Sequence, residues 1–143
     1  MMRSTIARRM AKATALLAST AGLMVFSPAP QAAAGECSLG FLCGYVQNKL
    51  PSSYTMKIAQ LGMGTETCRT EEGTFTCKTY WLPSGKTSKD IGVKDADALT
   101  VENAAWTTNN NSTWFAAGAW EKISDVESRL CVVEGGHPAC YQN

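Results

Sequence analysis

Six cysteines constrain the fold of this 143-residue chain more than any other feature of its sequence. They are Cys37, Cys43, Cys68, Cys77, Cys131 and Cys140. An even number of cysteines in a small exported chain indicates a disulfide framework, because disulfides persist in oxidising compartments. A zinc site would need four cysteine or histidine ligands at short spacing. The chain has one histidine and no C-x-x-C pair, so we expect disulfides and no metal.

Export is indicated by residues 1–34, which have the features of a secretory signal peptide. Four basic residues precede an apolar run over residues 13–26, which is too short to span a bilayer as a mature helix. The small residues Ala32–Ala34 form a cleavage site before Gly35. We therefore expect a bacterial signal peptide over residues 1–34 and one secreted, extracellular domain over residues 35–143.

The charge of the chain changes when this leader is removed. Four of the 13 basic residues and none of the 12 acidic residues lie in it, so the net charge falls from +1 to −3. Nucleic acids and anionic membranes attract basic surfaces, and the remaining sequence has no basic stripe. We therefore expect neither nucleic acid nor a membrane as a partner.

The segment between Cys68 and Cys77 predicts a β-hairpin. Threonine and aromatic residues after Gly73 are typical of a strand, and Glu72-Gly73 supplies a tight turn. That turn places Cys68 directly opposite Cys77 at a non-hydrogen-bonded pair, where Cα atoms lie about 4.5 Å apart. A disulfide spans this distance, so we predict a bond between these two cysteines.

The last segment repeats this spacing around Gly135-Gly136, which places Cys131 opposite Cys140. Pro138 then falls on a non-hydrogen-bonded pair, where its missing N–H removes no ladder bond. Two hairpins with matching register favour local pairing throughout. We therefore predict the disulfides Cys37–Cys43, Cys68–Cys77 and Cys131–Cys140. Each closes a short loop and contributes about 2–3 kcal/mol, so its main effect is to hold that loop in one shape.

Short strand-like segments separated by turns continue through the rest of the chain. We expect strands near residues 45–47, 54–60, 74–82, 119–124 and 128–133, with a loop at 61–64 and a polar turn region at 83–90. Residues 95–105 favour either a short helix or an irregular crossover, and residues 121–130 also have weak helical spacing. The pattern predicts an all-β fold, a small single-domain Greek-key sandwich tied by disulfides.

Residues with catalytic or ligand chemistry give weaker indications. His137 precedes Pro138 in a tight loop, which favours an exposed turn residue over a member of a catalytic triad. Asp95 and Asp97 could be the paired acids of a glycosidase, but a solvated pair is the simpler interpretation. Asn109–Thr113 could supply oxygen ligands to calcium, although a polar loop is favoured. We therefore expect no catalytic residue, no enzymatic activity and no cofactor.

The four tryptophans are Trp81, Trp106, Trp114 and Trp120. Tryptophan is large and apolar but carries one polar N–H group, so it suits both cores and half-buried strand positions. We expect these side chains mostly in such places. A carbohydrate-binding face built from them stays open as an alternative.

The opening segment of the expected mature chain resembles a known family. Residues 37–45, CSLGFLCGY, fit the C-x-x-G-x-x-C-x-[YW] pattern of the Streptomyces metalloproteinase inhibitors. Residues 102–115, ENAAWTTNNNSTWF, and residues 131–142, CVVEGGHPACYQ, resemble two further segments of that family. The resemblance implies a βγ-crystallin-like Greek-key fold and the function of a secreted peptidase inhibitor.

In that family a disulfide loop presents a Cys-Val bond to thermolysin-like zinc proteases. Carried over to this chain, the resemblance implies a protease-binding loop formed by Cys131, Val132, Val133 and Glu134. Cys131 would flank the targeted bond on its acyl side, and Val132 would enter the apolar pocket of the protease. The expected partner is an extracellular protease, namely a zinc metalloprotease. A secreted binding, toxin or antimicrobial protein on the same β scaffold stays open as the alternative.

Overall fold

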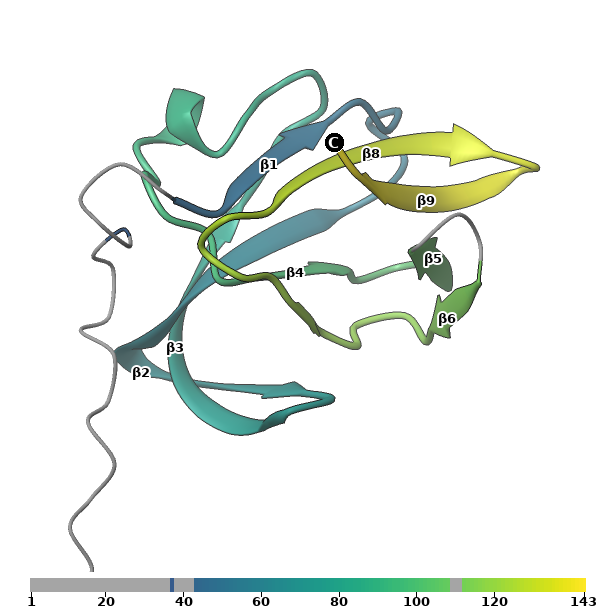
Figure 1. The fold of residues 1–143 in the computed structure, drawn as a ribbon. Coiled ribbons are helices and arrows are strands. Elements are labelled where there is room, and N and C mark those ends of the chain that lie inside the picture. Colours follow the sequence, from purple (N-terminus) through teal and green to yellow (C-terminus); the bar gives the residue numbers. More distant parts are fainter. Residues whose placement is uncertain (1–36, 38–42, 109–111) are drawn as a thin grey trace, which may run out of the picture.

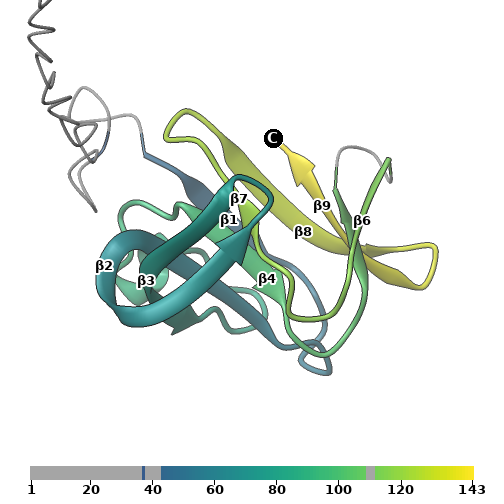
Figure 2. The same ribbon diagram turned by 90° about the horizontal axis from the view of Figure 1, so that it is seen from below.

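The computed structural model describes residue 37 and residues 43–108 and 112–143 of the chain. Within these residues the fold is all-β, with two sheets, three disulfides and one short 3₁₀ helix, η1 (Lys89–Ile91). Figure 1 and Figure 2 show the two sheets from perpendicular directions. The predicted fold class, a small disulfide-tied all-β domain, is confirmed.

The predicted leader and its cleavage site lie outside the described residues, and the described part contains no helix long and apolar enough to cross a membrane.

The first sheet has five strands and is built around a C-terminal hairpin. Its strands are β1 (Tyr45–Asn48), β5 (Trp106–Thr108), β6 (Thr113–Phe115), β8 (Ser128–Glu134) and β9 (His137–Gln142). Their order is β1-β8-β9-β5-β6, so the β8–β9 hairpin lies in the middle. The pairs β1–β8 and β5–β9 are parallel, which the sequence pattern did not indicate.

The second sheet has four strands, all antiparallel to their neighbours. They are β2 (Met56–Thr70), β3 (Gly73–Trp81), β4 (Ala98–Val101) and β7 (Glu121–Lys122), in the order β3-β2-β4-β7. The expected helix or crossover over residues 95–105 contains β4 instead. All four residues of β4 are buried, because the strand lies between β2 and β7 and under the first sheet. The helical spacing over residues 121–130 also gives no helix, since β7 and β8 occupy it.

Residues 61–64, predicted as a loop, belong to β2. The pairing of β2 with β3 jumps at this point, so Leu61 and Glu66 both face Cys77 across an irregular bulge. Gly64 has φ +70, and a Cβ atom there would lie 2.5 Å from the Cys77 carbonyl oxygen. Only glycine fits such a close approach with a positive φ, so the bulge depends on this residue.

The main core joins the two sheets. Its fully buried side chains come from both, and they include Val46, Met56, Ile58, Leu99, Val101, Trp106 and Ile123. Trp106 also stacks on Phe115 at a centroid distance of 4.4 Å. Burial of one such side chain contributes about 1.5–3 kcal/mol. A smaller second cluster lies under the β2–β3 hairpin and contains Ala59, Leu61, Cys68, Cys77 and Ala98.

The disulfide pairing matches the prediction in all three cases. Cys37–Cys43, Cys68–Cys77 and Cys131–Cys140 are bonded. In the β8–β9 hairpin the register is also confirmed, because Cys131 pairs with Cys140 and the turn lies at Gly135 and Gly136. Both glycines have a positive φ, as a two-residue hairpin turn requires.

The predicted register of the β2–β3 hairpin is wrong. Cys68 pairs with Phe75 and Cys77 pairs with Glu66, so the two cysteines are diagonal neighbours. The turn centre lies one residue earlier than predicted, and the Thr70 hydroxyl there accepts a hydrogen bond from the N–H two residues later, at 3.2 Å. This moves the pairing by two residues, which keeps both cysteines on one face of the hairpin and allows the disulfide.

Candidate functional site

The β8–β9 hairpin extends beyond the body of the domain, and its turn forms the tip (Figure 1 and Figure 2). The Cys131–Cys140 disulfide ties its two strands, and both cysteines are fully buried in the main core. The base of the hairpin is therefore fixed, while the segment from Val133 to the turn is exposed.

The bond between Cys131 and Val132, which the family resemblance implies as the target, lies inside the sheet. The Cys131 carbonyl accepts a hydrogen bond from the Lys49 N–H at 2.8 Å. On the other side of β8, Val132 pairs with Ala139 of β9. A protease binds a substrate as an extended segment with free backbone groups. The bond is therefore not accessible in this conformation, although Val133 and Glu134 are exposed.

Several side chains share the outer face of the hairpin and its neighbours. Val132 and Glu134 are two positions apart on β8, so their side chains share one face. His137 pairs with Glu134, and the pairing through β5 places Trp114 of β6 on the same face. We call Trp114, Val132, Glu134 and His137 the outer hairpin face.

Trp114 is the most exposed large group of this face, with 60% of its surface accessible. Its ring lies 4.6 Å from the His137 ring, and His137 is half-buried rather than the exposed turn residue that the sequence predicted. Trp114 was expected in the core or half-buried, so sequence reasoning missed it as a candidate contact. Its alternation with Thr113 and Phe115 fits a strand, but only the tertiary structure shows which side of that strand meets solvent.

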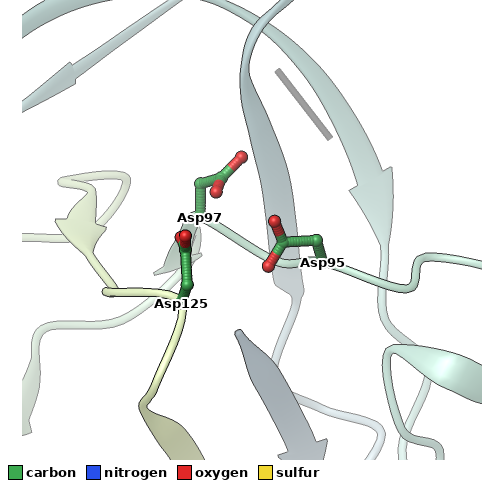
Figure 3. Close-up of side chains that lie close together, drawn as sticks. All are labelled: Asp95, Asp97 and Asp125. Atoms are coloured by element: carbon green, nitrogen blue, oxygen red, sulfur yellow. The ribbon is translucent and has the colours of Figure 1, made fainter. Parts of the chain in front are cut away.

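A second candidate site is a cluster of three carboxylates, Asp95, Asp97 and Asp125 (Figure 3). Asp95 and Asp97 lie just before β4, and Asp125 lies in the loop between β7 and β8. One oxygen from each lies within 4.8 Å of the others. The prediction that Asp95 and Asp97 form a solvated pair is therefore wrong, since Asp95 is only 2% exposed.

Backbone N–H groups hold two of these carboxylates in place. Gly44 donates to Asp95 Oδ1 at 2.7 Å, and Leu61 donates to Asp97 Oδ2 at 2.8 Å. Gly44 belongs to the opening cysteine motif, and a Cβ atom there would lie 2.0 Å from the Ala96 carbonyl oxygen. Gly44, which is an unspecified position of that motif, thus lets the chain entering β1 pass directly against the backbone beside Asp95.

Burial, and to a smaller extent the proximity of the other carboxylates, raises the pKa of Asp95 and Asp97. Burial raises the pKa of Asp97 to about 6, against the opposing effect of the Leu61 hydrogen bond, and the charges of Asp95 and Asp125 raise it further. Burial also raises the pKa of Asp95. Carboxylate oxygens are the ligands that Ca²⁺ and Mg²⁺ prefer, so these are the described residues whose chemistry suits a cation. A glycosidase pair would need wider separation and access for the sugar, which the burial of Asp95 opposes.

Of Asn109–Thr113, the other residues considered for calcium, residues 109–111 lie outside the described part of the chain, and Thr113 begins β6. Among the described residues, a buried ion pair joins the two sheets near the hairpin. Arg129 of β8 donates to Glu121 of β7 at 3.2 Å, and both side chains are about nineteen-twentieths buried. Thr108 of β5 also donates to Glu121, at 3.0 Å.

No family model, no curated protein and no solved structure matches this chain. The resemblance to the Streptomyces inhibitors and its βγ-crystallin-like topology therefore stay predictions. The functional proposal below depends on the geometry of the outer hairpin face together with that resemblance.

Proposed function

We propose that this chain is an exported peptidase inhibitor, without enzymatic activity of its own, that docks its outer hairpin face on a thermolysin-like metalloprotease. The observation that carries the proposal is an extended hairpin, tied by Cys131–Cys140, whose outer face bears Val132 and an exposed Trp114. The motif resemblance of residues 37–45 and 131–142 supports the choice of a protease as partner.

The composition of this face suits protein recognition. Tryptophan is enriched among the residues that dominate binding energy at interfaces. Val132 is already half-buried, so completing its burial would contribute less than the roughly 1.5–3 kcal/mol expected for a fully exposed side chain, and burial of Trp114, which is 60% exposed, would add to it. Because the disulfide and the neighbouring strands already fix the hairpin, little conformational entropy is lost on binding.

The proposed mode of inhibition differs from the one that the family resemblance implies. The Cys131 carbonyl is already bonded to Lys49, so the hairpin docks as a folded surface that blocks the cleft. Val132 acts as an apolar anchor through its side chain, and its peptide bond is not offered to the catalytic zinc. Inhibition of this kind leaves the bond between Cys131 and Val132 intact.

The test is peptide hydrolysis by a thermolysin-like protease in the presence of the oxidised mature protein. Micromolar protein should slow hydrolysis, and Val132→Asp should weaken this effect by at least about tenfold because a charge replaces the anchor. Val126→Asp is the matched control, since Val126 is 69% exposed in the loop before β8. Both variants should keep the wild-type circular dichroism spectrum. Absence of any slowing, or equal loss in both variants, would contradict the proposal.

The alternative is a secreted binding, toxin or antimicrobial protein that uses the same face on another partner. The inaccessibility of the Cys131–Val132 bond favours it, because a substrate-like inhibitor would expose that bond. Growth inhibition of other bacteria by the oxidised protein, without inhibition of a panel of proteases, would support this alternative.

A further inference from the structure

A second exposed tryptophan lies at the end of β3, in the sheet that does not contain the β8–β9 hairpin. Trp81 is 57% exposed and borders a shallow pocket of about 310 Å³. The other lining residues include Ser52, Tyr54, Thr55, Pro83 and Ser84. The pocket thus combines aromatic surface with the hydroxyl-bearing residues Ser52, Thr55 and Ser84, of which the Ser84 hydroxyl already donates to the Leu50 carbonyl at 2.6 Å.

The Trp81 ring is held in position before any ligand arrives. The Lys57 ammonium lies over one side of the ring, 4.4 Å from its centroid. Glu102 in turn fixes Lys57 through an ion pair of 2.7 Å. The next residue after Trp81, Leu82, donates its N–H to the Met56 carbonyl at 3.0 Å. An aromatic platform that is fixed in advance loses little entropy when a flat ligand stacks on it.

The charge of the pocket limits what it can bind. Its lining residues are all uncharged. Lys57, which lies over the Trp81 ring, is paired with Glu102 and so is largely neutralised. A charged ligand would therefore lose hydration without gaining a partner of opposite charge. The complementary ligand is neutral, with one apolar face for the indole and hydroxyl groups around its edge.

We propose that this pocket binds a neutral sugar ring of a polysaccharide. A pyranose presents C–H groups on its face and hydroxyl groups on its edge, which match the Trp81 ring and the serine and threonine rim. The volume lies at the lower end for small-molecule sites, so one ring fills it and the rest of the glycan continues into solvent. A proline-rich peptide, which also docks on aromatic grooves, would need an extended groove rather than one pocket.

The test is titration of the ¹⁵N-labelled oxidised protein with a glucose tetramer and with an N-acetylglucosamine tetramer. We expect the indole N–H signal of Trp81 to shift saturably at millimolar concentrations of at least one tetramer. Trp81→Ala should weaken binding by at least about tenfold, which corresponds to about 1.4 kcal/mol. Trp114→Ala is the matched control, because Trp114 is similarly exposed, and it should bind as the wild type does.

Three results would overturn the sugar site. They are no shift with either tetramer, equal loss in the two tryptophan variants, or a proline-rich peptide that shifts the Trp81 signal when the tetramers do not. The inference is independent of the inhibitor proposal, since Trp81 and the outer hairpin face lie on different sheets. Trp81→Ala should leave protease inhibition unchanged, so failure of one proposal does not imply failure of the other.

Discussion

The β2–β3 and β8–β9 hairpins carry the same cysteine spacing but use it differently. Both disulfides join residues nine positions apart. In β8–β9 the cysteines are directly paired, with Cα atoms 4.0 Å apart. In β2–β3 they are diagonal neighbours, with Cα atoms 5.8 Å apart. The same cysteine spacing therefore gives a disulfide within each hairpin, but the register between the two strands differs.

The surroundings of the two hairpins explain their different roles. The β8–β9 disulfide lies in the main core, and β8 and β9 are each paired on both sides. The β2–β3 disulfide lies in the smaller cluster, and β3 is an edge strand. The first disulfide therefore fixes a surface that the whole domain supports. The second stabilises a hairpin that has a small core of its own.

The largest expected effect comes from Arg129, which ties β8 to the second sheet. Arg129→Ala leaves the buried charge of Glu121 without its partner, so the free energy of unfolding should fall by about 3–5 kcal/mol. Arg69→Ala, on an exposed position of β2, is the control and should change it by less than about 0.5 kcal/mol. Urea denaturation of both variants measures the difference. Similar values for the two would show that the inter-sheet ion pair does not support the hairpin.

Removal of each disulfide should separate global from local stability. Replacement of Cys131 and Cys140 by alanine, or of Cys68 and Cys77, should lower the free energy of unfolding by about 2–3 kcal/mol. Amide hydrogen exchange then distinguishes the pairs. Faster exchange should be confined to the β2–β3 hairpin beyond residue 61 when its disulfide is lost, because β2 pairs with β4 only at residues 56–59. It should spread from β8–β9 to β1 and β5, because these strands pair with the hairpin at the cysteines themselves. Equally widespread fast exchange in both double variants would contradict the proposed difference between the two hairpins.

A smaller effect is expected from Asp97, whose carboxylate accepts the Leu61 N–H at the start of the β2 bulge. Its pKa is raised to about 6, so the folded state binds more protons than the unfolded state between about pH 4 and pH 6. Stability therefore falls as the pH rises through this window, and the loss is complete above it. Asp97→Asn should remove this slope and raise the free energy of unfolding at pH 7 by about 1–2 kcal/mol, which is less than the full pKa shift implies because solvent screens this partly exposed carboxylate.

This prediction is checked by denaturation of both proteins from pH 4 to pH 8 in a buffer with a chelator, so that no cation screens the carboxylates. Asp90→Asn is the control, because the pKa of Asp90 is lowered by its hydrogen bonds with Thr87 rather than raised. A wild-type profile that rises between pH 4 and pH 6 and stays level above would contradict a raised pKa at Asp97.

Local sequence signals were sufficient for features that local residues determine. Gly135 and Gly136 fix a two-residue turn, so the register of β8–β9 and the position of Pro138 followed from the sequence. The β2–β3 turn could be centred on Glu72-Gly73, as predicted, or one residue earlier, as observed. The hydrogen bond to the Thr70 hydroxyl belongs to the observed turn, and the prediction did not consider it. The four residues of β4 are flanked by two aspartates and a glutamate, so the sequence around them did not indicate a buried strand.

Features that depend on tertiary contacts could not be predicted. Asp125 joins Asp95 and Asp97 from a separate loop, so spacing along the chain did not connect them. Trp106 and Trp114 are both strand residues, yet one is fully buried and the other is mostly exposed. Their exposure depends on which face of the first sheet each side chain lies on. That face is set by the parallel pairing of β5 with β9, which are distant in the sequence.

The parallel pairing of β1 with β8 also has a consequence for the order of folding. Tyr45 lies opposite Ser128, so β1 gains its neighbouring strand only when almost the whole chain is present, although residues 85–88 already bond to its backbone. Contacts between such distant segments slow folding, because the intervening chain must first be brought together. The first sheet therefore cannot be completed until its last strands, β8 and β9, have been synthesised.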